Sequence, residues 1–101
     1  ILAIPGLEAI FFGPADLSAA SGHLGSWDEH GVADVLATIK AKAASQGIAA
    51  GIMARSVADS LNRRDQGFQM VALGADMTLL VRALRENLAQ LGEERPLQLV
   101  F

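Results

Sequence analysis

The clearest indication of the fold is the stretch Ala9-Ile10-Phe11-Phe12-Gly13-Pro14-Ala15-Asp16-Leu17-Ser18. Its unbroken apolar start is typical of a strand buried on both faces in a parallel sheet. Gly13-Pro14 ends that strand, because proline has no N–H group for the ladder and disfavours helical geometry in the residue before it. Asp16 therefore lies just past the carboxyl end of a strand, where α/β sheets and βα barrels bind ligands. From position alone, a cap of the following turn explains Asp16 equally well.

Composition limits the class of protein. The 101 residues are enough for one domain at most, and 51% of them are apolar. A net charge of −3 offers no surface for nucleic acid or anionic membranes. The absence of cysteine excludes disulfides and thiolate metal sites, and it agrees with a cytoplasmic protein. No apolar run reaches the roughly 18 residues of a membrane span, and the N-terminal residues do not form a signal peptide.

Apolar runs and periodicity predict three strands, each followed by a helix. The first strand precedes a short helix-compatible segment and a glycine-rich loop, and residues 1–8 look like the end of a helix and a turn. Ser56 and Asp76 are the expected N-caps of the two later helices. The strands are expected at 8–13, 48–53 and 69–73, and the longer helices at 32–46, 57–65 and 76–91.

This repetition favours a parallel α/β sheet with right-handed crossovers. The helix at 32–46 has one apolar stripe for the core, and the helix at 76–91 has another from Met77 to Leu91. A closed (β/α)8 barrel needs eight such units in about 250 residues. Three units alone leave open strand edges and half a core exposed to water. We therefore expect the chain to be part of a larger domain.

A resemblance strengthens this interpretation. The segment from Ala9 to Gly22, with its Gly13-Pro14-Ala15-Asp16-Leu17-Ser18 hexapeptide, resembles the HpcH/HpaI aldolases, which are class II, metal-dependent pyruvate aldolases. The similarity continues in order through 49–52, 66–76 and 79–84. It implies that residues 1–101 are the last three βα units of a TIM barrel, incomplete as given. It also implies a lyase that cleaves 4-hydroxy-2-oxo acids into pyruvate and an aldehyde through a metal-stabilised pyruvate enolate.

The resemblance assigns roles to particular residues. Asp16 becomes one of two protein ligands of a divalent metal, Mg²⁺, Mn²⁺ or Co²⁺, and these cations prefer oxygen ligands. The loop Gly13, Pro14, Ala15 and Asp16 binds the substrate carboxylate, with backbone N–H groups of Ala15 and Asp16 as donors. Leu79 is a weaker candidate for the aldehyde pocket, and core packing is its alternative role. The second ligand, the catalytic base and the pyruvate-binding arginine are expected upstream, so we expect no catalytic residue within this chain.

Other polar residues have simpler explanations. His23 and His30 lie in a glycine-broken loop without metal-ligand spacing, and we expect them to be solvated. Arg63 and Arg64 fit an exposed helix face, and Ser18 has no histidine base at a known spacing. Trp27 is a candidate for a subunit contact.

The apolar surface of the last predicted helix indicates contacts between subunits. The helix at 76–91 is apolar over more than one stripe, and in the wider superfamily the last helix is exchanged between subunits. We therefore expect a homo-oligomer of dimers, with a hexamer implied by the resemblance, and the tail 96–101 as an extension of the contact. The alternative is a non-catalytic module that serves only packing and oligomerisation.

Overall fold

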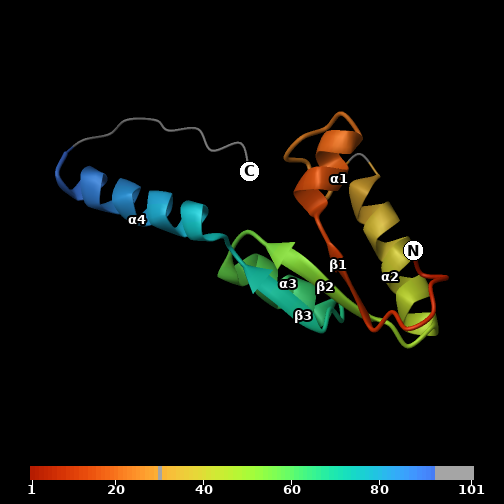
Figure 1. Ribbon diagram of the computed structural model, residues 1–101. Coiled ribbons are helices and arrows are strands. Elements are labelled where there is room, and N and C mark those ends of the chain that lie inside the picture. Colours follow the sequence, from red (N-terminus) through yellow and green to blue (C-terminus); the bar gives the residue numbers. More distant parts are fainter. Residues whose placement is uncertain (30, 93–101) are drawn as a thin grey trace.

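The computed structural model describes residues 1–29 and 31–92, in which helices follow strands along the chain (Figure 1). The predicted strands and longer helices are all present, with bounds within one residue of those expected. The tail 96–101 and His30 lie outside the described residues. The elements are β1 (Ala9–Phe12), α1 (Pro14–Ala20), α2 (Val32–Ser45), β2 (Ala49–Ala54), α3 (Val57–Asp65), β3 (Met70–Leu73) and α4 (Asp76–Gln90).

The three strands form a parallel sheet in the order β1-β2-β3. Phe12 pairs with Ile52 in β2, and Ile52 pairs with Val71 in β3. Because the strands run in one direction, their carboxyl ends meet at one edge of the sheet. The parallel α/β sheet predicted from the strand–helix pattern is therefore confirmed.

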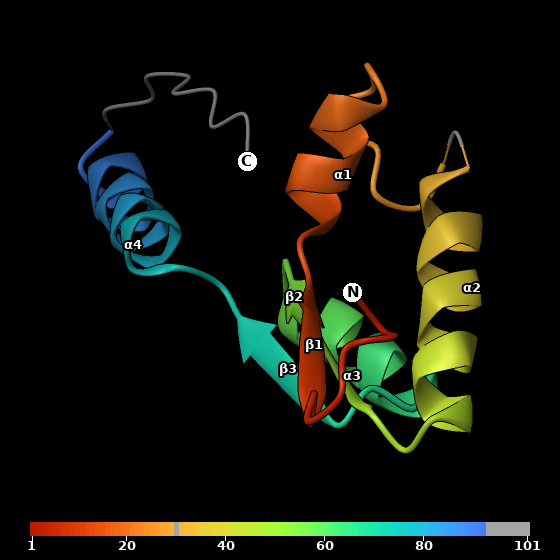
Figure 2. The same cartoon turned by 45° about the vertical axis from the view of Figure 1, so that its right-hand side comes forward.

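The core lies between one face of the sheet and the helices. Helices α2 and α3 lie on the same side of the sheet (Figure 2), and Ile52 of the central strand is fully buried beneath them. The rings of Phe12 and Phe68 meet edge to face with centroids 5.8 Å apart, a favourable aromatic geometry. The core cluster comprises Phe12, Val32, Leu36, Ala50, Ile52 and Phe68.

The opposite face of the sheet is apolar but open. Phe11 and Met70 flank Gly51 there, and a Cβ atom on Gly51 would lie 2.7 Å from Cδ2 of Phe11 and 2.8 Å from Cε of Met70. A glycine is therefore required for these two side chains to close over β2. Phe11 is 48% exposed and Met70 is 51% exposed. The described residues thus cover β1 on its helix-facing side and not on both faces as the sequence had predicted.

Helix α4 extends away from the sheet (Figures 1 and 2). All its residues are described, and none of them is buried. Leu80 is 61% exposed and Leu84 is 51% exposed, although both belong to the apolar stripe predicted for the core. Leu73, at the end of β3, is also 47% exposed. The described residues therefore leave the apolar stripe of the last helix uncovered.

The N-cap predicted from the sequence is confirmed for α3 but not for α4. Ser56 caps α3 as predicted, since its Oγ accepts a hydrogen bond of 3.1 Å from the Asp59 N–H. The predicted cap of α4 was wrong by one residue: Ala75 is the N-cap, and Asp76 is the first helical residue. Residues 1–8 form turns and bends without helix. No helix within 1–29 and 31–92 is long and apolar enough to cross a membrane.

Candidate active site

The segment from Gly13 to Asp16 joins the carboxyl end of β1 to the first turn of α1. Pro14 is the first helical residue, a position where its missing N–H costs nothing. The first intrahelical hydrogen bond runs from the Leu17 N–H to the Gly13 carbonyl at 3.0 Å. The N–H groups of Ala15 and Asp16 therefore precede the helical ladder and have no carbonyl partner in their own helix. They are donors suited to an anionic ligand at this edge of the sheet.

The Asp16 carboxylate folds back over Gly13. A Cβ atom on Gly13 would lie 2.7 Å from Oδ2 of Asp16, so any side chain at this position would displace the carboxylate. Asp16 is itself exposed, so its oxygens are accessible to a ligand. The hard oxygens of a carboxylate suit Mg²⁺ or Mn²⁺, and the residue fits the predicted metal-ligand role. Among the described residues, no three histidine, cysteine, aspartate or glutamate side chains gather into a metal site.

Ser18 has a structural role in the same helix. Its side chain is fully buried. The hydroxyl donates to the Ala15 carbonyl at 2.8 Å and accepts from the Gly25 N–H at 3.2 Å. These bonds hold the loop after α1 against the helix that carries Asp16. His23 lies in this loop with an exposed side chain.

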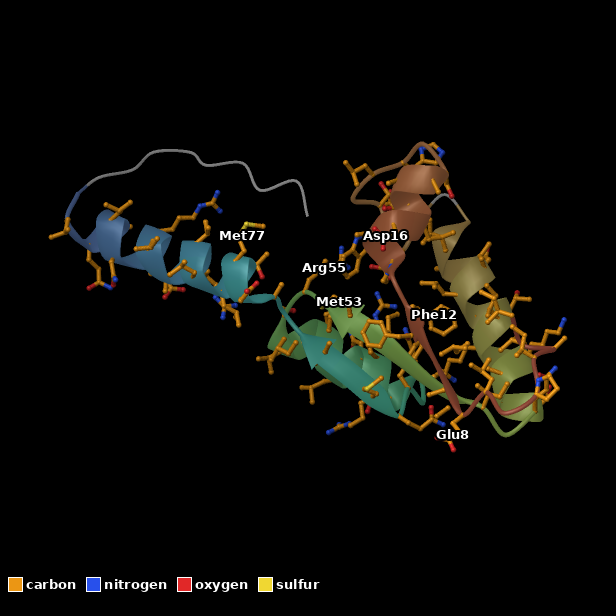
Figure 3. The ribbon with its side chains drawn as sticks, in the orientation of Figure 1. Glu8, Phe12, Asp16, Met53, Arg55 and Met77 are labelled. Carbon is orange, nitrogen blue, oxygen red and sulfur yellow. The ribbon has the colours of Figure 1, made fainter. Side chains whose placement is uncertain are left out.

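A pocket of about 320 Å³ opens beside this segment, where all three strands end. Ala15 contributes one wall, and the residues that end or follow β2 and β3 contribute the others. Figure 3 shows Asp16 at the start of α1 and Arg55 just past the end of β2. The lining residues are Ala15, Trp27, Met53, Ala54, Arg55, Gly74, Ala75, Met77 and Thr78.

The predicted site residues are only partly brought to this pocket. Ala15 lines it directly, and Gly13, Pro14 and Asp16 flank it along the chain. Leu79 instead lies against Gly74, where a Cβ atom would be 3.3 Å from its Cδ2 atom. A larger cavity of about 400 Å³ lies between α2 and α3, and none of these five residues lines it.

Trp27 and Arg55 line the pocket although neither was predicted to belong to the site; Trp27 was a candidate for a subunit contact, and Arg55 had no predicted role. Trp27 is 5% exposed and packs within its own chain, with the Arg55 guanidinium 4.8 Å from its ring centroid. Arg55 follows the last residue of β2, so the strand-end rule applied to Asp16 would have found it. Trp27 comes from an irregular loop, and no periodic signal marks it.

Arg55 belongs to an ion-pair cluster. Asp28 accepts hydrogen bonds from Nη2 of Arg55 at 2.6 Å and from Nη2 of Arg63 at 2.8 Å. Asp59 lies 3.1 Å from Nε of Arg63 and 3.5 Å from Nε of Arg55. Arg63 was predicted to lie on an exposed helix face, and this prediction was wrong because its side chain is 5% exposed. Arg64 is 68% exposed, as expected.

The cluster changes the acidity of Asp28. Partial burial acts to raise the pKa of this carboxyl group, but the hydrogen bonds and positive charges of Arg63 and Arg55 outweigh burial and lower the pKa. Asp28 therefore remains ionised at neutral pH and keeps both arginines in place.

A parallel βα sheet with a carboxylate and two N–H donors beside a pocket at its carboxyl edge has the arrangement at which α/β proteins bind ligands. The sequence model of the HpcH/HpaI aldolase/citrate lyase family matches residues 1–83. The chain belongs to this family of aldolases and lyases, as the hexapeptide at 13–18 predicted.

Individual relatives agree with this assignment. The chain is 44% identical over 90 residues to a hydroxypyruvate/pyruvate aldolase of Paraburkholderia phytofirmans, covering 89% of this chain and 35% of the relative. It is 38% identical to a 5-keto-4-deoxy-D-glucarate aldolase of Salmonella paratyphi C, covering 88% and 34% respectively.

A solved HpcH/HpaI aldolase/citrate lyase family protein from Burkholderia cenocepacia superposes with a TM-score of 0.81 at 36% identity. That match covers 91% of this chain and 36% of the solved chain. The α/β fold is thus that of solved family members. The chain spans about a third of the length of the relatives it matches.

Proposed function

We propose that this chain is the C-terminal part of a metal-dependent aldolase that splits 4-hydroxy-2-oxo acids into pyruvate and an aldehyde, or joins them. The observation that carries the proposal is the position of Asp16 and the Ala15 N–H beside a pocket at the carboxyl edge of a parallel sheet. The aldolase names of the relatives agree with this chemistry. A cytoplasmic location and a role in the catabolism of aromatic compounds or sugar acids belong to the same proposal.

Asp16 would supply one carboxylate ligand to Mg²⁺, Mn²⁺ or Co²⁺. When bound, the cation polarises the keto and carboxylate oxygens of pyruvate and stabilises the negative charge that develops when a methyl proton leaves. Gly13 leaves space for the Asp16 carboxylate to fold back. Pro14, with its restricted φ, starts the helix so that the next two N–H groups face the ligand edge.

The Ala15 and Asp16 N–H groups would hold the pyruvate carboxylate. Both precede the first intrahelical hydrogen bond, which begins at the Leu17 N–H. Two N–H donors on a fixed helical turn orient a carboxylate and exclude water from two of its hydrogen-bonding positions. Leu79 stays a weaker proposal for the aldehyde side. The second ligand, the base and the arginine are proposed to lie upstream of Ile1.

We further propose that the missing barrel strands cover the open sheet face. Phe11 and Met70 form an apolar layer there that is about half exposed, whereas the interior of a closed barrel is filled by such layers. This observation supports the interpretation of residues 1–101 as the last three βα units of one TIM-barrel domain.

Exchange of α4 between subunits is a proposal of the same kind. The helix lies away from its own sheet (Figure 1), and its leucines remain exposed together with Leu73 at the end of β3. A partner subunit that receives α4 would bury several large side chains, each worth roughly 1.5–3 kcal/mol. The proposed assembly is a homo-oligomer of such dimers, with a hexamer as the specific form. The alternative function, a non-catalytic packing module, rests on these same exposed residues.

The test uses the full-length protein that carries this sequence. Exchange of the pyruvate methyl protons with D₂O and pyruvate release from a 4-hydroxy-2-oxo acid are measured after EDTA treatment and again with added Mn²⁺. The proposal expects both activities to disappear with EDTA and to return with Mn²⁺. A protein that binds no divalent metal and shows neither activity would favour the packing module instead.

A further inference from the structure

Trp27 forms a flat wall of the pocket at the carboxyl edge of the sheet. It is the one tryptophan of the sequence, and the loop between α1 and α2 places it on the pocket that Ala15 also lines. The indole is 5% exposed, so its position is set by contacts within the chain. The Arg55 guanidinium stacks over the ring at 4.8 Å from the centroid, a favourable cation–π arrangement.

Arg55 is held in this position by two carboxylates. Asp28, the neighbour of Trp27 in sequence, accepts from Nη2 of Arg55 at 2.6 Å. Asp59 accepts from the Arg55 backbone N–H at 2.9 Å and lies 3.5 Å from its Nε atom. Asp28 is itself anchored by Arg63, whose side chain is 5% exposed. The indole and the guanidinium are therefore fixed from the loop, from β2 and from α3 at once.

The charges of this cluster balance. Two arginines face two aspartates, so the Arg55 guanidinium is compensated and is not a free cation for an anionic substrate group. The other lining residues are mainly apolar, among them Met53, Ala54 and Met77. A pocket with a planar indole wall, apolar neighbours and an arginine that is already paired with two aspartates favours an uncharged, extended or aromatic substituent.

We propose that Trp27 determines which aldehyde the enzyme accepts and that Arg55 is the positioning residue that holds the indole in the pocket wall. This inference rests on the proposed aldolase function. The aldehyde, which is the second substrate, would bind against the Trp27 indole, whereas Ala15 and Asp16 would bind pyruvate. The preferred aldehyde carries an uncharged substituent large enough to reach the indole.

The experiment compares KM values for benzaldehyde and glycolaldehyde in the full-length protein with pyruvate and Mn²⁺. Trp27→Ala should raise the KM ratio of benzaldehyde to glycolaldehyde about tenfold or more. The variant loses the apolar contact between the indole and the phenyl ring, and loss of an apolar contact in a binding pocket changes discrimination between two substrates by about tenfold or more. Trp27→Phe should keep the ratio closer to that of the wild type. Arg55→Gln should move the ratio in the same direction, and Arg55→Lys should not restore it, because lysine lacks the planar fork.

A double variant separates positioning from general structural damage. If Arg55 acts through Trp27, adding Arg55→Gln to Trp27→Ala should change the ratio by less than twofold, whereas independent effects would multiply. Arg64→Gln is the matched control, because Arg64 is 68% exposed and pairs with Asp65 on the protein surface. Exchange of the pyruvate methyl protons, which needs no aldehyde, should change far less than the KM ratio.

An unchanged KM ratio in Trp27→Ala, or multiplicative effects in the double variant, would overturn this inference and leave the aldolase function standing. A wild-type protein without metal-dependent pyruvate exchange would overturn both. If Trp27→Ala does not fold, the KM ratio of benzaldehyde to glycolaldehyde is compared between the wild type, Trp27→Leu and Arg55→Gln instead.

Discussion

Replacing Arg63 by methionine tests the ion-pair cluster beneath the pocket. Methionine keeps much of the apolar stem of the arginine but removes the guanidinium that pairs with Asp28 at 2.8 Å and with Asp59 at 3.1 Å. Arg63 is buried, and removing one partner of a buried ion pair costs roughly 3–5 kcal/mol because the other charge is left uncompensated.

Two features reduce this cost. The Asp28 side chain is 51% exposed and can return to water. Asp59, although only 13% exposed, keeps the Arg55 backbone N–H at 2.9 Å. We therefore expect Arg63→Met to lower the free energy of unfolding by about 2–3 kcal/mol, below the range for a fully buried pair.

The assay is urea unfolding of the full-length protein at pH 7 and low salt, with Arg64→Met as the control. Arg64 is 68% exposed, and loss of an exposed pair costs about 0–1 kcal/mol. A loss for Arg63→Met no larger than that for Arg64→Met would contradict the conclusion that the buried Arg63 side chain holds Asp28 and Asp59 together.

Three further predictions concern pH, assembly and activity. The pKa of Asp28 is lowered in the folded protein, so its contribution to stability should be complete above the usual aspartate pKa of about 3.9 and lost as the pH falls through the pKa of the folded state. Asp28→Asn should therefore make the free energy of unfolding depend less on pH in this range. An unchanged pH dependence would contradict the ion pairing of Asp28. The double change Leu84→Asp with Leu88→Asp should give monomers or insoluble protein, and elution from a sizing column at the wild-type assembly mass with normal melting would rule out exchange of α4. The 101-residue chain alone should show no aldolase turnover, and metal-dependent pyruvate release by the purified chain would disprove the need for upstream residues.

Much of the fold was predictable because its determinants are local. The apolar run before Gly13-Pro14 predicted β1 and its end. The apolar stripe of α2 predicted Val32 and Leu36 in the core, where both are buried, but Val35 and Ile39 of the same stripe are exposed. Ser56 was predicted as a cap because its hydroxyl satisfies an N–H group three residues away. The shift of the α4 cap to Ala75 is within the usual uncertainty of helix boundaries.

The environment of Arg63 was not predictable, because its partner Asp28 is 35 residues away in an irregular loop. The periodicity of apolar residues predicts the helix face on which a residue lies, but it does not predict whether a loop packs over that face. The same loop buries Trp27 beside the strand ends, whereas the sequence offered a subunit contact only as a candidate role for this residue. Hydrogen bonds of Ser18, including one to the Gly25 N–H, hold this loop, and such contacts leave no periodic signal.

The metal affinity of Asp16→Asn in the full-length protein shows whether Asp16 is a metal ligand. Asp34→Asn is the matched control, because Asp34 is also an exposed aspartate in the first turn of a helix, on α2 and away from the pocket. Mn²⁺ binding is followed by electron paramagnetic resonance in the presence of pyruvate. We expect Asp16→Asn to weaken Mn²⁺ binding by more than about 100-fold, since loss of a residue that only orients a metal ligand already costs about 10–100-fold. Asp34→Asn should bind Mn²⁺ like the wild type. Equal Mn²⁺ affinity in Asp16→Asn and the wild type would show that Asp16 is not a metal ligand.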